Sequence, residues 1–459
     1  MNYLFDKVDN SKLVIFRVFF GLLVTIECWG AIATGWVKET LVDTTYTFTF
    51  IGFEWTQFLL GDTMYAIYAI MGALGVLIML GAFYKAAAWS FFLLWGLTYF
   101  MQKSHYNNHY YLLWVVALLM AIVPAHRYMS IDSNFNARLR SMITERWTIN
   151  IFKIQIFFVY FFAAVAKLYP GWYEHRFLQI RMASSAQWFR DKMNLDWFAD
   201  FITQPSIIQF LTWGGIFFDF LIVPLLLFKP TRKIAFLAAA IFHIFNSITL
   251  QIGIFPYFAL ALCIFFFDND EVRNWFLPWK GRFALNDSEL VKPVRRAWIQ
   301  GFILIFIAIQ LYLPLRHWLI PGDVLWTEEG HRKAWRMMLR SKTGMANFVV
   351  VTPDGESRYI QPGDYLRPHQ IPGLYTKPDH MWQFAQKIKQ DFSQKGQQEV
   401  QVYVKNSMVS INGGPMHPFI NDSVDLANTK WRYFGQQSWI LSEPENYYYK
   451  DQSTSQPNR

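Results

Sequence analysis

The sequence is poor in charged residues and in cysteine. Only 16% of its 459 residues are charged, whereas 53% are hydrophobic and 19% are aromatic. A soluble domain carries about 25% charged residues, so this composition excludes an ordinary soluble protein and indicates lipid as the solvent of much of the chain. The two cysteines, Cys28 and Cys263, exclude a disulfide framework and a Cys-x-x-Cys metal site, and we expect no bound metal.

The sequence also lacks a basic patch interleaved with a nucleic-acid-binding motif. Its formal charge is +9, but the lysines and arginines lie in the segments between apolar runs, as membrane topology requires. We therefore expect no nucleic-acid partner. No short cleavable apolar region precedes the first apolar run, so we expect this run to be retained as a membrane span.

Long apolar runs fill the first two thirds of the chain. Their lengths predict about nine transmembrane helices. The predicted spans are residues 11–31, 64–83, 87–101, 111–124, 149–167, 207–228, 234–250, 253–267 and 298–316. The third, fourth and eighth have only about 15 apolar residues, so we expect tilted, re-entrant or longer helices there.

The distribution of basic residues predicts the orientation. With nine spans, most lysines and arginines of the membrane region fall on the face that carries the amino terminus. The positive-inside rule makes this face cytoplasmic, and the carboxy-terminal part of the chain then lies outside.

Residues 317–459 lose the long apolar runs and have the patterns of a soluble α+β domain. A hairpin is expected over 348–360 with its turn at Pro353-Asp354-Gly355, a helix near 378–395, and a strand at 400–404. We therefore divide the chain into a transmembrane helical domain (1–316), an extracytoplasmic α+β domain (317–445) and a disordered tail (446–459). The predicted fold class is a polytopic α-helical membrane protein with a carboxy-terminal soluble domain.

Polar residues inside apolar segments are the candidate functional residues, because an unpaired polar group in hydrocarbon costs several kcal/mol. Asn107-Asn108-His109 precede the fourth predicted span, Lys167 ends the fifth, and His243 with Asn246 share a face of the seventh. Each group also has a purely structural interpretation. These are a polar helix cap, a lysine that reaches the membrane surface, and a hydrogen bond between helices.

Topology favours a common site for these residues. His109, Lys167 and, less closely, Asn246 fall toward the non-cytoplasmic ends of their helices, on the side of the carboxy-terminal domain. Burial would disfavour the ammonium form of Lys167, which would make a neutral amine available as a base. We hypothesise a shared site at the outer leaflet, covered by the soluble domain.

At these residues the sequence resembles the vitamin K-dependent gamma-glutamyl carboxylase family, whose bacterial relatives carry the horizontally transferred transmembrane (HTTM) domain. The order and spacing of the matching segments are kept over nearly the whole chain. These segments are Phe16 to Gly21, Asn107 to Leu112, Ala125 to Tyr128, Asn136 to Arg138, Gln155 to Trp172, Phe242-His243, Asn246-Ser247, Ile252 to Phe255, Tyr257, Leu313-Pro314, and Trp335 with Met337-Met338.

The resemblance implies an enzyme that couples oxygenation of a reduced naphthoquinone, vitamin K hydroquinone, to carboxylation of a protein glutamate. A lysine at the position of Lys167 would deprotonate the hydroquinone, and oxygen would then give an alkoxide that removes the glutamate γ-proton. The carbanion would add CO2, and the quinone would leave as its epoxide. Asn108 and His109 would be catalytic with Lys167, and Asn107, Asn108, His109, His243 and Asn246 would bind the quinone cofactor.

The sequence departs from animal members of the family in lacking their long carboxy-terminal extension and luminal disulfide. These departures suggest a bacterial inner-membrane protein with a peptide or protein glutamate substrate of unknown identity. Two alternatives remain: a quinol epoxidase without glutamate carboxylation, and a quinone-binding transport protein. No inverted repeat supports the latter.

Overall fold

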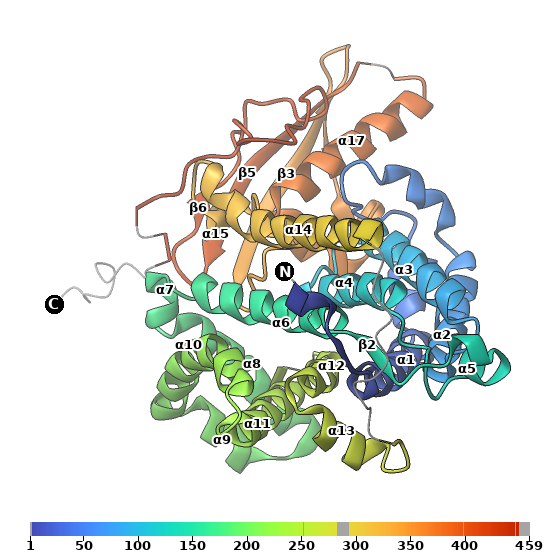
Figure 1. Cartoon of the computed structure of the whole chain (residues 1–459). Helices are drawn as coiled ribbons and strands as arrows, with labels where there is room; N and C mark the ends of the chain where they lie inside the picture. Colours follow the sequence, from blue (N-terminus) through green and yellow to red (C-terminus); the bar gives the residue numbers. More distant parts are fainter. Residues whose placement is uncertain (1, 251, 282–292, 398, 446, 449–459) are drawn as a thin grey trace.

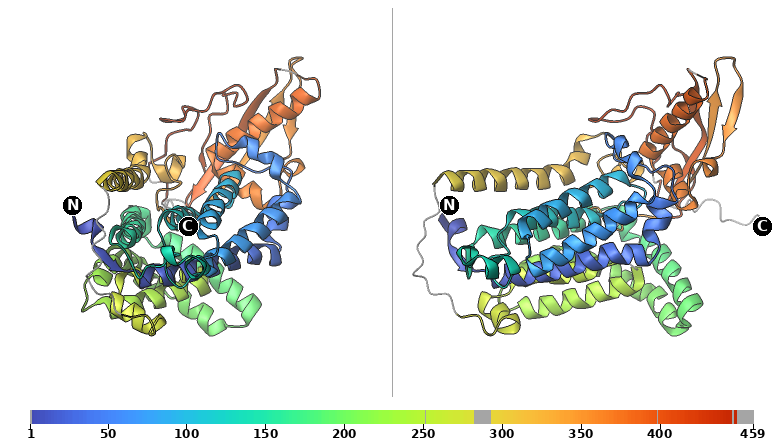
Figure 2. Two further views of the ribbon diagram at one scale, coloured as in Figure 1. Left: turned by 45° about the vertical axis from the view of Figure 1, so that its right-hand side comes forward. Right: turned by 90° about the vertical axis from the view of Figure 1, so that its right-hand side faces the viewer.

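Each of the nine predicted spans is helical in the computed structural model, which describes residues 2–250, 252–281, 293–397, 399–445, 447 and 448. The corresponding helices are α1 (Ser11–Ala33), α2 (Thr63–Leu80), α3 (Tyr84–Met101), α4 (Asn108–Ile122), α6 (Trp147–Ala166), α10 (Pro205–Leu227), α11 (Arg232–Leu250), α12 (Phe255–Leu262) and α14 (Pro293–Leu315). Figure 2 shows most of them running side by side along the bundle.

Six of these helices are long and apolar enough to cross a membrane: α1, α2, α6, α10, α11 and α14 with the turn that follows it. Helices α4 and α12 are apolar but shorter, and α3 does not reach the same apolar character over its 18 residues. Within the described residues, six candidate spans are therefore supported where the sequence predicted nine, and the orientation of the chain remains a prediction.

Three helices between α6 and α10 were not predicted: α7 (Pro170–Tyr173), α8 (Arg176–Met193) and α9 (Asp196–Thr203). Helix α8 has polar and charged residues on its outer face and buries Phe177, Met182 and Phe189 on the other. Helices α8 and α9 pack on each other and on α10 beside the long helices (Figure 1).

Close packing joins the first two long helices. A Cβ atom on Gly21 would lie 2.4 Å from the backbone nitrogen of Met79, so only glycine allows α1 and α2 to approach this closely. Short elements complete the membrane part. These are β1 (Lys7–Asp9), which pairs with β2 (Ile143–Glu145), and α5 (Ile131–Phe135) and α13 (Asn269–Phe276).

The carboxy-terminal part contains a four-stranded antiparallel sheet in the order β4-β3-β5-β6. Its strands are β3 (Lys342–Val351), β4 (Ser357–Ile360), β5 (Gln401–Ile411) and β6 (His417–Pro418); the helices with them are α15 (Val324–Thr327), α16 (Ile371–Thr376) and α17 (Pro378–Gln394). The predicted hairpin is confirmed, because Phe348 pairs with Ile360, and so are the predicted helix and strand. The predicted tail lies outside the described residues, apart from Tyr447 and Tyr448.

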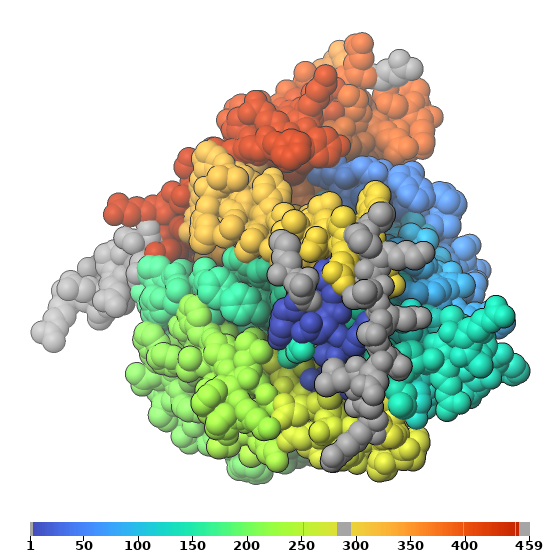
Figure 3. All heavy atoms as spheres, in the orientation of Figure 1, coloured from blue at the N-terminus to red at the C-terminus, as the bar shows by residue number. Residues whose placement is uncertain are grey.

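Figure 2 shows the sheet-containing domain at one end of the long helices, and in Figure 3 this domain, in orange and red, forms the top of the molecule. The loop between α1 and α2 enters its hydrophobic core, where Phe48 stacks on His380 at 4.2 Å between ring centroids. Lys103, which follows α3, forms a buried ion pair with Asp379 of α17. These contacts fix the domain against the α1–α2 loop and the end of α3.

Candidate active site

The amino-terminal end of α4 carries two asparagines with different roles. Asn107 is the helix cap, since its side-chain oxygen accepts a hydrogen bond from the Tyr110 amide at 2.7 Å. Asn108 is buried and reaches the carboxy-terminal domain: its Nδ2 donates to the Arg336 carbonyl oxygen at 3.0 Å. The Tyr106 hydroxyl donates to Asn108 Oδ1 at 2.9 Å. The structure thus gives Asn107 a structural role and makes Asn108 a link between the two parts of the chain.

The partner of Asn108 belongs to the segment 328–341, which we call the seam segment because it lies between the long helices and the sheet. Four of its non-glycine residues, Glu328, Lys333, Trp335 and Met338, have φ values between 52° and 65°. Such left-handed backbone is strained for these residues and is held only where the surroundings over-determine it. Trp335 is fully buried against Tyr111 of α4, which supplies part of that constraint.

His109 and His243 both lie next to one aromatic ring, that of Phe255. The His109 ring stacks on Phe255 of α12 at 3.8 Å between centroids, and Phe255 lies 5.8 Å from His243 of α11. The Tyr160 hydroxyl and His243 Nε2 form a hydrogen bond of 2.7 Å. The ring nitrogens of His109 have no hydrogen-bond partner among the described residues, which leaves them available to a ligand.

Lys167 caps the end of α6 and is 8% exposed. Its ammonium forms a buried ion pair with Asp219, in the middle of α10, and lies 5.6 Å from the centre of the Trp172 ring. Asp219 was missed in the sequence analysis, although an acid inside an apolar run is the same signal that identified Lys167. The structure therefore places Lys167 beside a carboxylate rather than beside Asn108 and His109.

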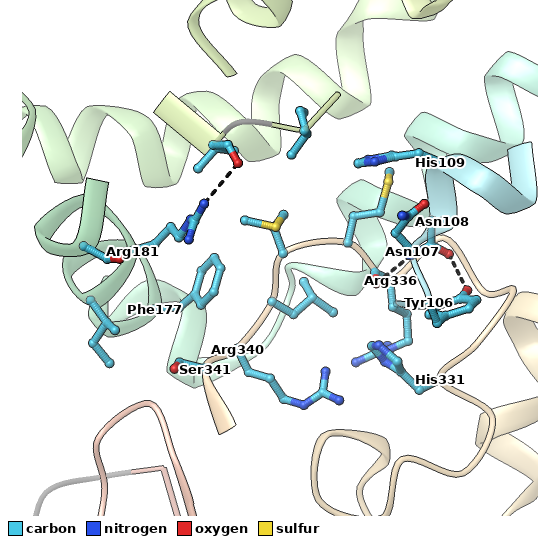
Figure 4. A pocket seen from close by; sticks show the side chains of 17 residues that line it. Tyr106, Asn107, Asn108, His109, Phe177, Arg181, His331, Arg336, Arg340 and Ser341 are labelled. Atoms are coloured by element: carbon cyan, nitrogen blue, oxygen red, sulfur yellow. Dashed lines mark hydrogen bonds between the residues drawn. The ribbon is translucent and has the colours of Figure 1, made fainter. Parts of the chain in front are cut away.

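A cavity of about 550 Å³ opens between α4, α8, the end of α11 and the seam segment. Asn107, Asn108 and His109 line one side of it, and Phe177 and Arg181 line the opposite side (Figure 4). Its other lining residues are Tyr106, Ile180, Ser184, Leu250, Ile252, His331, Arg336, Met337, Met338, Leu339, Arg340 and Ser341. The cavity thus combines an apolar wall with amide, imidazole and guanidinium groups.

Lys167, His243 and Asn246 do not line this cavity. Two contacts connect Lys167 to the cavity. Its ammonium lies next to the Trp172 ring, and Trp172 packs on the cavity-lining Phe177 with 5.9 Å between ring centroids. The neighbouring Tyr169 also donates a hydrogen bond to the Leu339 carbonyl of the seam segment. Asn246 is half-buried on α11, one turn before the cavity-lining Leu250.

Buried ion pairs hold the seam segment to the sheet. Glu328 pairs with Arg340 and, at 3.3 Å, with Lys342. Burial alone would raise the pKa of the Glu328 carboxyl, but Arg340 and then Lys342 outweigh it and hold that pKa well below its usual range. Arg340 lines the cavity, and its charge is balanced by Glu328, which does not line it.

These features define a polytopic membrane protein whose candidate site is shared between a helical bundle and a sheet-containing domain. The family model of the HTTM domain matches residues 5–271, and that of the vitamin K-dependent gamma-carboxylase lumenal domain matches residues 295–446. The chain belongs to the vitamin K-dependent gamma-carboxylase family. No solved structure matches the chain.

Proposed function

We propose that this protein is a vitamin K-dependent gamma-glutamyl carboxylase, which couples oxygenation of a reduced naphthoquinone to carboxylation of a protein glutamate. The observation that carries the proposal is the shared cavity, where Asn108 and His109 of the helical bundle face the arginines of the seam segment. An aromatic cofactor and an anionic side chain each find suitable groups there.

The lining residues suit a reduced naphthoquinone. A volume of about 550 Å³ lies within the roughly 300–1,000 Å³ typical of small-molecule sites. Ile252, Met337 and Met338 supply apolar surface, while the free ring nitrogens of His109 and one unused N–H of Asn108 can hydrogen-bond to quinol oxygens. When bound, the hydroquinone supplies, by its reaction with oxygen, the strong base that glutamate deprotonation requires.

In this proposal the ionisable residues outside the cavity lining accept and transfer protons, and their neighbours support the pocket. Asp219 first takes a proton from Lys167, and the neutral amine then accepts the hydroquinone proton, for which the Lys167 side chain has to turn past Trp172 into the cavity. His243 and Asn246 support the pocket from α11, His243 through Tyr160 and Phe255. The apolar wall limits water, which would otherwise quench the base and the carbanion.

For localisation we propose a bacterial inner membrane, with the amino terminus in the cytoplasm and the cavity and carboxy-terminal domain on the periplasmic side. The excess of basic residues on the amino-terminal face supports this orientation. Single cysteines introduced at exposed Phe135 and Tyr359, in a variant with Cys28 and Cys263 replaced, test it. A membrane-impermeant maleimide added to intact spheroplasts should label only the second.

A coupled assay tests the activity. The purified protein in nanodiscs is incubated with vitamin K hydroquinone, oxygen, labelled bicarbonate and a short glutamate peptide, and the epoxide and the peptide-bound label are measured separately. Formation of both supports the proposal. Epoxide without label would indicate an epoxidase that does not carboxylate glutamate, and neither product from folded protein would favour a quinone-binding or transport role.

A further inference from the structure

The cavity is positively charged on its polar side. Arg181, Arg336 and Arg340 line it, and none of the lining residues is an aspartate or a glutamate. Cations gathered in a partly apolar cavity without acids favour an anionic ligand, because unpaired charges are costly away from water.

Two of the three arginines are already engaged. Arg340 forms its ion pair with Glu328, and Arg181 donates from Nη2 to the Leu250 carbonyl at 3.1 Å. Arg336 has a single side-chain hydrogen bond among the described residues, with 3.4 Å from its Nη1 to His317 Nε2. No acidic side chain lies within ion-pair distance of Arg336 there, and its Nε has no partner.

The position of Arg336 is nevertheless fixed. Its carbonyl oxygen accepts the hydrogen bond from Asn108, and the preceding Trp335 is fully buried. His317 Nδ1 lies 2.7 Å from the Pro314 carbonyl, so Nδ1 donates there and a neutral ring presents the Nε2 lone pair to Arg336. Burial, followed by the charge of Arg340, lowers the pKa of Arg336 to about 10, which keeps it charged at neutral pH.

We infer that Arg336 is the receptor for the γ-carboxylate of the substrate glutamate; this inference rests on the proposed carboxylase function. A guanidinium whose backbone is fixed and whose side chain has no acidic partner among the described residues can bind a carboxylate through two parallel hydrogen bonds. A glutamate bound by Arg336 lies on the Asn108–His109 side of the cavity, where the proposed cofactor binds.

The same contact assists the reaction. The γ-carbon C–H bond breaks, its proton passes to the base formed from hydroquinone and oxygen, and the electron pair remains on carbon and spreads onto the carboxylate oxygens. The positive charge of Arg336 stabilises this added negative charge. The electron pair then forms the new C–C bond to CO2, which gives the second carboxylate of the product.

Steady-state kinetics of Arg336→Gln and Arg336→Lys test the inference, with Arg358→Gln, an exposed arginine of β4, as the matched control. With a glutamate peptide we expect Arg336→Gln to raise KM at least tenfold and Arg336→Lys to raise it less. The KM for hydroquinone, measured from epoxide formation at saturating peptide, should stay within threefold of the wild-type value. The control variant should behave as wild type.

An unchanged peptide KM in Arg336→Gln would overturn the inference, and so would a raised KM for hydroquinone, which would assign Arg336 to the quinol. Peptide binding measured without cofactor separates this failure from failure of the proposed function. If wild-type protein makes neither product, a labelled glutamate peptide should still bind more tightly than its glutamine counterpart. That preference should vanish in Arg336→Gln, and its persistence would overturn the inference.

Discussion

The Lys167 ammonium and the Asp219 carboxylate form a buried ion pair that joins α6 to α10, 52 residues apart in sequence. Bringing two charges out of water is costly, and their attraction repays that cost only while both are present. The pair therefore ties the stability of the bundle to the residue that we propose as the base. The next two predictions separate these effects.

The first prediction concerns stability. Asp219→Asn leaves a buried ammonium without its counter-charge, so we expect a loss of about 3–5 kcal/mol in the free energy of unfolding. The double variant Lys167→Met with Asp219→Leu removes both charges and should recover most of that loss. Thermal unfolding in one detergent measures both. Equal melting temperatures for the wild type and Asp219→Asn would contradict the prediction.

The second prediction concerns activity. Lys167→Ala and the double variant should both lose epoxide formation by about 10²-fold or more, the usual contribution of a positioned base. A small primary amine added to Lys167→Ala should restore part of the rate. Because the double variant is expected to be stably folded, full activity in it would refute the role of Lys167 as a base.

The third prediction uses the adjacent asparagines as a matched pair. Asn107→Ser keeps a side-chain oxygen at the helix cap and should change activity less than twofold. Asn108→Leu loses the hydrogen bonds with Tyr106 and Arg336, so kcat for both products should fall at least tenfold. The same coupled assay measures both variants. A larger effect at Asn107 than at Asn108 would contradict these roles.

The fourth prediction concerns acid. Burial opposes the charges of Glu328 and Asp379, but Arg340 and Arg332 outweigh it and depress the pKa of each carboxyl well below its usual range. An acid whose folded-state pKa is depressed contributes stability above its unfolded pKa, about 4, and loses it as pH falls toward the folded value. The melting temperature should therefore drop steeply below about pH 4.

Glu328→Gln provides the control for the acid prediction. It should lower the melting temperature at pH 7, because Arg340 loses its buried partner, and it should weaken the dependence on pH below 4. An identical acid profile in this variant would show that other groups cause the loss.

The sequence predicted the long helices well because each depends on local composition alone. Helix α8 was not predicted because it lies outside the apolar runs. Its one buried face, with Phe177 and Phe189, is also interrupted by Arg181 and Arg190. The hairpin and α17 were predicted because turn residues and periodicity are also local signals. Each of these features is encoded within about twenty neighbouring residues.

The site was harder to predict because its geometry depends on distant contacts. Asn108 meets Arg336 across 228 residues, and no local pattern indicates that pairing. The sequence did place His109 and Lys167 toward the carboxy-terminal domain. In the structure Asn108, at the start of α4, and Tyr169, which follows α6, each form a hydrogen bond with the seam segment. The pairing of Asp219 with Lys167, and the lack of an acidic partner for Arg336 among the described residues, became evident only in three dimensions.

The seam segment has a consequence for mutational surveys of this protein. A substitution such as Trp335→Ala, made far from any reacting atom, would release the strained backbone and shift Arg336 and Arg340 together. Its phenotype would imitate loss of a catalytic group while the defect lay in assembly. Genetic screens that measure only product formation will therefore assign catalytic roles to too many residues of the seam segment. The abundance of folded protein has to be measured together with the turnover rate.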